Sequence, residues 1–147
     1  MAGVTRRLPA NAQPIGRSRI AVYKPWTASI DEGWTRLVLE RYEFKFASLT
    51  DQQVRSGNLR AQFDAIVLPN VAPDRLASGY DDTAVPPEYT GGLSPAGVDA
   101  LRAFVRAGGT LICLGQSGGL ARSGLFPRVL RSSQGYLSSV RTNRSFG

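Results

Sequence analysis

The chain has no histidine, and its 147 residues include a single cysteine, Cys113. A serine or cysteine nucleophile normally needs a neighbouring base, most often histidine, so the lack of histidine argues against the common catalytic triads. A zinc site of histidine and glutamate ligands, or of several cysteines, cannot be assembled either. One cysteine also excludes an internal disulfide framework. We therefore expect no enzymatic activity, no metal and no cofactor.

Long apolar runs are also missing. No segment approaches the roughly 18 consecutive apolar residues that a membrane-spanning helix requires. Residues 1–19 include two early arginines, but no apolar run of about seven or more residues follows them, as a secretory signal peptide would require. We expect no membrane span and no signal peptide, and a soluble chain that is cytoplasmic by default.

Acidic residues are absent from both ends of the chain. The net charge is +7, with five basic residues in 1–30 and seven in 100–147, whereas 31–99 holds six basic and eleven acidic residues. Basic ends of this kind can attract nucleic acid or an acidic protein surface. No helix-turn-helix, RNA-binding aromatic motif or zinc finger accompanies them, which argues against nucleic acid.

One strand, loop, helix and strand unit is present in full near the start. The short apolar run at 20–23 is typical of a buried parallel strand. Ser29 to Glu32 has the pattern of a capping box, which predicts a helix starting near Ile30. Apolar side chains and one arginine follow at helical spacing, namely Trp34, Leu37, Val38 and Arg41.

The alternation of strands and helices continues to about residue 114, and it predicts a parallel sheet with right-handed crossovers. The region 71–93 is rich in proline, glycine and aspartate without periodicity, so we expect a long functional loop there. The other predicted elements are a strand at 44–49, a helix opened by a capping box at 50–53 and ending at Gly57, a strand at 63–69, a helix from an N-cap at Ser94 with Pro95 at its first position up to 108–109, and a strand at 110–114.

Three segments carry a resemblance to a known family: YKPWTASIDEGWTRLVLERYEF at 23–44, LRAQFDAIVLP at 59–69 and VPPEYTGGLSPAGVDALRAFVRAGGTLICLG at 85–115. They resemble the glutamine-amidotransferase-like domain that follows the catalytic domain in many bacterial M14 zinc-carboxypeptidase-like proteins. The resemblance covers residues 8–121 and implies a three-layer, flavodoxin-like α/β domain of the class I amidotransferase type. Such a domain is usually an accessory without the amidotransferase's own chemistry.

The resemblance fades from about Arg122, where family members continue with further strands and helices. Either the domain is truncated or its end is remade. We therefore divide the chain into a basic N-terminal extension at 1–18, an amidotransferase-like α/β domain at 19–121 and an Arg/Ser-rich segment at 122–147. We expect residues from about Ser132 onward to lie outside the core.

Two residues in or directly after the predicted last strand are candidate nucleophiles. Ser117 lies in a G-x-S-x-G motif directly after the strand, which is the position of a nucleophile elbow. Without a base nearby, we interpret it as part of a glycine-rich turn. Cys113 lies inside the strand, before the first glycine of that motif, so we expect it to pack as a small hydrophobic residue. The zinc peptidase chemistry of the resembling proteins does not carry over.

Open α/β sheets bind ligands in the crevice at the carboxyl ends of their strands. We expect a ligand-binding crevice there, and no glycine-rich nucleotide motif accompanies it. Asp31 and Glu32 also have a structural reason to be where they are, because acidic side chains stabilise the first turn of a helix. The predicted crevice residues are Lys24, Trp26, Ser29, Asp31, Glu32, Tyr89 and Gly91.

Three functions follow from these observations. The leading one is a non-catalytic α/β domain that takes part in protein interaction or supports a peptidase domain. The first alternative is a small-ligand-binding module that uses the crevice. The second is a stand-alone structural subunit that docks on a larger assembly through its basic ends.

Overall fold

The computed structural model describes residues 16–26, 29–80, 85–122, 130–131 and 137–140. For 88, 130–131 and 137–140 it describes the backbone only.

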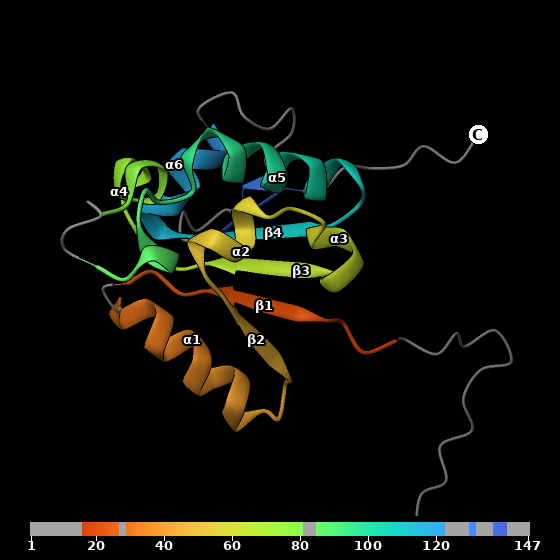
Figure 1. The fold of residues 1–147 in the computed structure, drawn as a ribbon. Coiled ribbons are helices and arrows are strands. Elements are labelled where there is room, and N and C mark those ends of the chain that lie inside the picture. The colour runs from red at the N-terminus through yellow and green to blue at the C-terminus, as the bar shows by residue number, and fades with distance from the viewer. Residues whose placement is uncertain (1–15, 27–28, 81–84, 123–129, 132–136, 141–147) are drawn as a thin grey trace, which may run out of the picture.

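Four parallel strands form the centre of the domain (Figure 1). They are β1 (Ile20–Tyr23), β2 (Phe46–Leu49), β3 (Ala65–Leu68) and β4 (Thr110–Leu114), in the order β2-β1-β3-β4. This is the α/β fold predicted from the sequence, and its topology is consistent with a flavodoxin-like domain.

Two further strands extend the sheet beyond β4. The backbone of β6 (Leu137–Val140) pairs antiparallel with β4, and β5 (Leu130–Arg131) pairs antiparallel with β6. The side chains of both strands are outside the described residues. That the segment from about Ser132 lies outside the hydrophobic core therefore stays a prediction, as does the division of the chain at residues 18 and 121.

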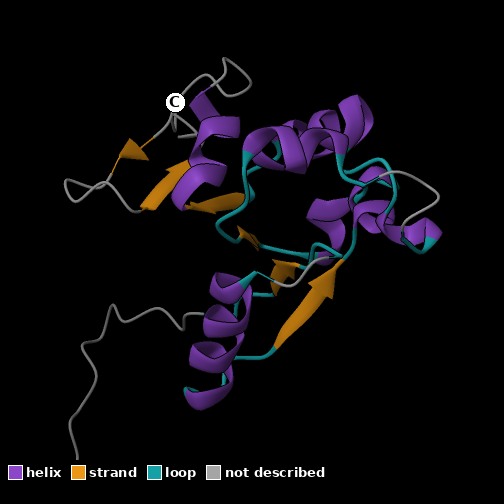
Figure 2. Cartoon of the chain, turned by 90° about the vertical axis from the view of Figure 1, so that its left-hand side faces the viewer, coloured by secondary structure: helices purple, strands orange, loops and turns teal. Residues whose placement is uncertain are grey.

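The helices lie on opposite faces of the sheet, as Figures 1 and 2 show. One face carries α1 (Ile30–Arg41) alone among the described helices. The other face carries α2 (Asp51–Arg55), α3 (Leu59–Gln62), α4 (Pro73–Ser78) and α5 (Ser94–Arg106). The arrangement follows from right-handed crossovers. The chain moves from β1 to β2 in one direction along the sheet, and then from β2 to β3 and on to β4 in the other direction.

The hydrophobic core lies between the sheet and α5. Alternate residues of the strands face it, because side chains of a strand point to the two faces of the sheet in turn. Its members include Ala21, Tyr23, Ile66, Leu68, Leu111 and Cys113 from the sheet, and Leu101, Phe104 and Val105 from α5. The burial of Cys113 confirms that it packs as a small hydrophobic residue, and this burial raises the pKa of its thiol to about 12.

The predicted helix starts are partly confirmed. At α2 the capping box is complete, since Thr50 Oγ1 accepts from the Gln53 amide and Gln53 Oε1 accepts from the Thr50 amide at 2.8 Å. At α1, Ser29 Oγ accepts from the Glu32 amide at 3.0 Å, and the helix begins at Ile30 as predicted. The side chain of Glu32, however, pairs with Arg36 instead of completing the box.

The predicted loop at 71–93 was wrong in part. It contains α4 and the 3₁₀ turn η1 (Pro87–Tyr89). Both are too short for a periodic signal, although a proline at the start of each is a known helix-opening feature. The predicted N-cap at Ser94 was also wrong: α5 begins at Ser94 itself, which has a φ of 53° and makes no side-chain cap bond.

Asp64 joins the amino ends of β1 and β3. Its carboxylate accepts from the amide of Arg19 at 2.9 Å, from the guanidinium of Arg19 at 2.9 and 3.1 Å, and from Arg60 at 2.6 Å. These bonds, above all those from the Arg19 side chain, hold the pKa of Asp64 far below its usual range. The carboxylate is thus stabilised in its charged form when the chain is folded.

We expect Asp64→Asn to remove a pH-dependent part of the stability. A lowered pKa contributes stability above the unfolded pKa of about 3.9, and that contribution is lost as the pH falls further toward the folded pKa. Because its partner Arg19 is half-exposed, we expect a loss of only about 1 kcal/mol at pH 7. Urea unfolding at pH 7 and pH 3 measures it. The wild-type chain should lose more stability than the variant between these pH values, with Asp74→Asn as the control at an exposed carboxylate; an identical pH dependence would contradict the role of Asp64.

Candidate functional site

The sequence predicts a crevice where the chain leaves β1 and β3 at their carboxyl ends. The strand order reverses at this point, which is the usual ligand position in open α/β sheets. The backbone leaves β1 through Lys24, whose amide donates to the carbonyl of Leu49 at the end of β2 at 2.9 Å. It leaves β3 through Asn70, whose side-chain oxygen accepts from the amide of Gln116 at 2.9 Å. These bonds tie the ends of neighbouring strands together.

Two of the predicted site residues meet at this edge. The rings of Trp26 and Tyr89 lie 5.1 Å apart between centroids, with a tilt of 50°. Trp26 is 45% exposed. Aromatic pairs in tilted contact at this distance attract one another beyond the effect of burial alone. The pair therefore places a solvent-accessible aromatic surface at this edge of the sheet.

The segment that carries Tyr89 is held by Arg55, which the sequence analysis did not identify. Its guanidinium donates to the carbonyl of Thr90 at 2.9 Å and also to that of Gly92. The amide of Gly91 donates to the carbonyl of Tyr80 at 3.0 Å. Gly91 thus contributes backbone to the segment. The sequence around Arg55 contains no signal for these bonds, because an arginine in the last turn of a short helix is usually exposed to solvent.

The remaining predicted residues do not join the aromatic pair. Ser29 caps α1, and Glu32 is buried against Arg36 with 3.3 Å between the carboxylate and guanidinium. The backbone carbonyl of Asp31 accepts from the hydroxyl of Thr35. Within the described residues, the structure thus assigns the acidic residues of this region to α1, in agreement with their helix-stabilising interpretation.

A buried polar pair lies between β1 and α2. The hydroxyl of Tyr23 donates to the carboxylate of Asp51, and both residues are 2% exposed. Burial raises the pKa of Tyr23 far above its usual value and also raises the pKa of Asp51, where the hydrogen bond from Tyr23 partly offsets the effect. The two side chains satisfy one another between β1 and α2, so they connect the sheet to the helix that presents Arg55.

Ser117 is fully buried in the turn after β4. Its hydroxyl donates to the main-chain carbonyls of Leu114 at 2.7 Å and Leu68 at 3.3 Å. Gly115 has a φ of 56°, and a side chain there would lie 2.6 Å from the Asn70 side-chain oxygen. The G-x-S-x-G motif therefore forms a tight turn that packs against the end of β3, as the glycine-rich-turn interpretation predicts.

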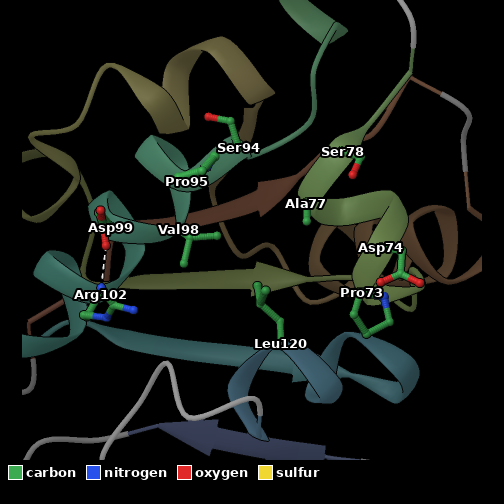
Figure 3. Close-up of a pocket in the computed structure, with 10 residues that line it drawn as sticks. All are labelled: Pro73, Asp74, Ala77, Ser78, Ser94, Pro95, Val98, Asp99, Arg102 and Leu120. Carbon is green, nitrogen blue, oxygen red and sulfur yellow. Dashed lines mark hydrogen bonds and ion pairs between the residues drawn. The ribbon is translucent and has the colours of Figure 1, made fainter.

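Two cavities lie outside the predicted crevice. One, of about 610 Å³, is shared by α4, α5 and α6 (Gly118–Leu120), and its mostly apolar wall includes Val98, Leu120 and the ion pair of Asp99 with Arg102 (Figure 3). The other, of about 770 Å³, lies near the amino ends of β1 and β2. Its lining combines aromatic and basic side chains, among them Arg17, Tyr42, Phe44, Lys45 and Phe63.

The outer side of α1 is the most unusual surface of the described chain. Ile30 is 80% exposed, Trp34 60%, Leu37 50% and Val38 52%. These four residues, named here the α1 apolar face, follow the helical spacing seen in the sequence. In most surface helices such a stripe packs on the sheet. Here the stripe is exposed and points away from the sheet, and the only buried residue of α1 is Glu32.

Among the described residues, no three histidine, cysteine, aspartate or glutamate side chains form a group that would hold a metal ion. None of the described helices is long and apolar enough to cross a membrane.

Comparisons with protein-family models, with curated proteins and with solved structures found no match for this chain. The structure shows a four-stranded parallel α/β fold, and the amidotransferase-like resemblance stays a prediction.

Proposed function

We propose that this chain is a non-catalytic α/β domain that binds another protein through the α1 apolar face. The observation that carries the proposal is the distribution of exposed large hydrophobic residues. Within the described parts of the chain, all seven lie between residues 26 and 44: Trp26, Ile30, Trp34, Leu37, Val38, Tyr42 and Phe44.

A concentrated patch of this kind has a physical cost. Each exposed apolar side chain remains in contact with water, and contiguous apolar patches on monomers usually mark interaction sites. The α1 apolar face contains Trp34, and the exposed Tyr42 directly follows the helix. Tryptophan and tyrosine are enriched among the residues that dominate binding energy at interfaces. Buried hydroxyl and thiol groups at Ser117 and Cys113 agree with a role that does not depend on a nucleophile.

The finer identity is proposed on the resemblance. The strand order β2-β1-β3-β4, with α1 on one face and α5 on the other, is compatible with the three-layer flavodoxin-like architecture of a class I amidotransferase-like accessory domain. If the chain is such an accessory domain, we propose that the α1 apolar face contacts a peptidase-like domain or another subunit of an assembly.

The test is Leu37→Glu, which places a charge at the middle of the α1 apolar face without touching the core. We expect partners recovered from source cells with the wild-type chain, and confirmed with purified components, to bind the variant at least tenfold more weakly, a difference of about 1.4 kcal/mol. Ala103→Glu is the matched control, because it adds the same charge to an exposed position of α5. Equal binding by both variants would contradict the proposal.

A second function is favoured by the aromatic surface of Trp26 and Tyr89. We propose that the crevice takes a small flat or sugar-like ligand against these rings, since exposed aromatic faces stack such molecules. Fluorescence titration of a Trp34→Phe chain reports Trp26 alone, because the chain has two tryptophans.

Docking through the basic ends at 1–18 and 122–147 stays a prediction, since most of these residues are outside the described parts.

A further inference from the structure

The side of α1 that faces the sheet is polar. The carboxylate of Glu32 lies 3.3 Å from the guanidinium of Arg36, which also lies 3.5 Å from the hydroxyl of Ser48 and 5.5 Å from the ring centre of Phe46 in β2. With 3.6 residues per turn, Glu32 lies on nearly the opposite side of the helix from Ile30 and Trp34. The side chain of Arg36 therefore connects α1 to β2 through a hydrogen bond and a cation–π contact, while the α1 apolar face is exposed.

The two ends of α1 carry opposite charges, so the helix is complementary to a second copy of itself in antiparallel orientation. Asp31 lies in the first turn of α1 and Arg41 in the last. Neither the Asp31 carboxylate nor the Arg41 guanidinium forms an ion pair with another residue in the described ranges. When two copies of α1 lie antiparallel, each acidic first turn meets a basic last turn. In the same alignment Trp34 lies opposite Val38, and Leu37 lies near the middle of the contact.

The size of the patch is also suited to a pair of copies. Trp34 on the α1 apolar face is 60% exposed, and Tyr42 and Phe44, which follow the helix, are 70% and 56% exposed. Aromatic side chains bury about 150–250 Å² each when covered, so these three alone offer on the order of 400 Å². The aliphatic residues Ile30, Leu37 and Val38 bring the surface toward the roughly 800 Å² that each partner contributes to a standard interface.

We propose that the α1 apolar face is covered by the same face of a second copy of this chain. The two α1 helices pack antiparallel about a two-fold axis, so that Asp31 of each copy faces Arg41 of the other. A two-fold contact of this type is closed, because the same patch serves on both copies. The inference rests on the proposed function and names the partner: a second, identical protein chain.

The test measures the oligomeric state of the purified full chain by sedimentation equilibrium over about a hundredfold range of concentration. We expect a monomer–dimer equilibrium, which Leu37→Glu shifts to monomer. Asp31→Arg and Arg41→Asp each bring like charges together at both symmetric contacts of the dimer. Because like charges in contact repel, each substitution should raise the dissociation constant of the dimer about tenfold. Arg106→Asp, at an exposed position in the last turn of α5, is the matched control and should leave the equilibrium unchanged.

Mixing provides the decisive measurement. In a two-fold pair, one chain with Asp31→Arg and one with Arg41→Asp restore opposite charges at both contacts, so the equimolar mixture should dimerise more tightly than either variant alone. The double variant Asp31→Arg, Arg41→Asp should recover the wild-type equilibrium. Circular dichroism checks that every variant folds.

The outcomes separate this inference from the proposed function. A chain that is monomeric throughout, or a dimer that is indifferent to Leu37→Glu and to the charge exchanges, overturns the two-fold pairing. If the monomeric chain still binds a different purified protein, and Leu37→Glu weakens that binding, the proposed function stands while this inference fails.

Discussion

Phe104→Ala should lower the free energy of unfolding by about 3–5 kcal/mol, as large-to-small substitutions of buried aromatic residues do. Phe104 is 1% exposed in α5 and belongs to the core between that helix and the sheet. Its ring covers Gly109, where the chain turns from α5 into β4. Removing the ring would leave a cavity at this junction, and urea unfolding measures the loss.

The contact with Gly109 makes the prediction sharper. A Cβ atom at Gly109 would lie 2.4 Å from Cζ of the Phe104 ring, closer than atoms can approach. Gly109→Ala alone should therefore cost about 1–3 kcal/mol through overpacking. In the Phe104→Ala background the methyl group has space, so its cost should fall by at least half. Strictly additive effects would show that the ring does not rest on Gly109.

Gly79→Ala is expected to disrupt the segment that carries Tyr89. Gly79 has a φ of 64° and a ψ of −137°, a combination that only glycine adopts readily. A Cβ atom there would also lie 2.1 Å from the amide nitrogen of Gly92 and 2.5 Å from its Cα atom. Because both neighbours are backbone atoms, no side-chain movement relieves the overlap. We expect a loss of more than about 3 kcal/mol, since the backbone strain alone costs about 1–3 kcal/mol.

The effect should reach the crevice. The carbonyl of Gly92 accepts from Arg55, and the amide of the next residue, Leu93, donates to the carbonyl of Leu76 at 2.8 Å. Displacing it should move Tyr89 away from Trp26, and the fluorescence of Trp26 in a Trp34→Phe chain should change. Gly57→Ala is the control, since Gly57 also has a positive φ of 74° but no atom lies within 4 Å of its Cβ position. If both substitutions cost about 1 kcal/mol, the close approach of the two glycines is not important for stability.

Much of the central fold was predictable because its signals are local. The apolar runs at β1 and β4 predicted strands that the structure shows at 20–23 and 110–114. Helix starts at Ile30 and Asp51 followed from side chains that can accept from free amide groups within one turn. Alternation of strands and helices then predicted a parallel sheet.

The candidate site was less predictable, because it depends on contacts distant in sequence. Trp26 and Tyr89 were both identified, and their proximity followed from the rule for strand ends. Arg55, which holds the Tyr89 segment, and Gly79, which allows the chain to approach Gly92, have roles that appear only when the segments are placed together. Short helices such as α3 and α4 were missed, since four to six residues show no reliable period.

The sequence by itself determined the parallel α/β class, the starts of α1 and α2, and the burial of Cys113. Each depends on neighbours within a few residues or on apolar runs. Only the tertiary structure decided which side of α1 faces the sheet. A helical stripe specifies that an apolar face exists but not what covers it. Here Glu32 is the buried residue of α1 and Arg36 lies over Phe46 of β2, whereas Trp34 and its neighbours are exposed.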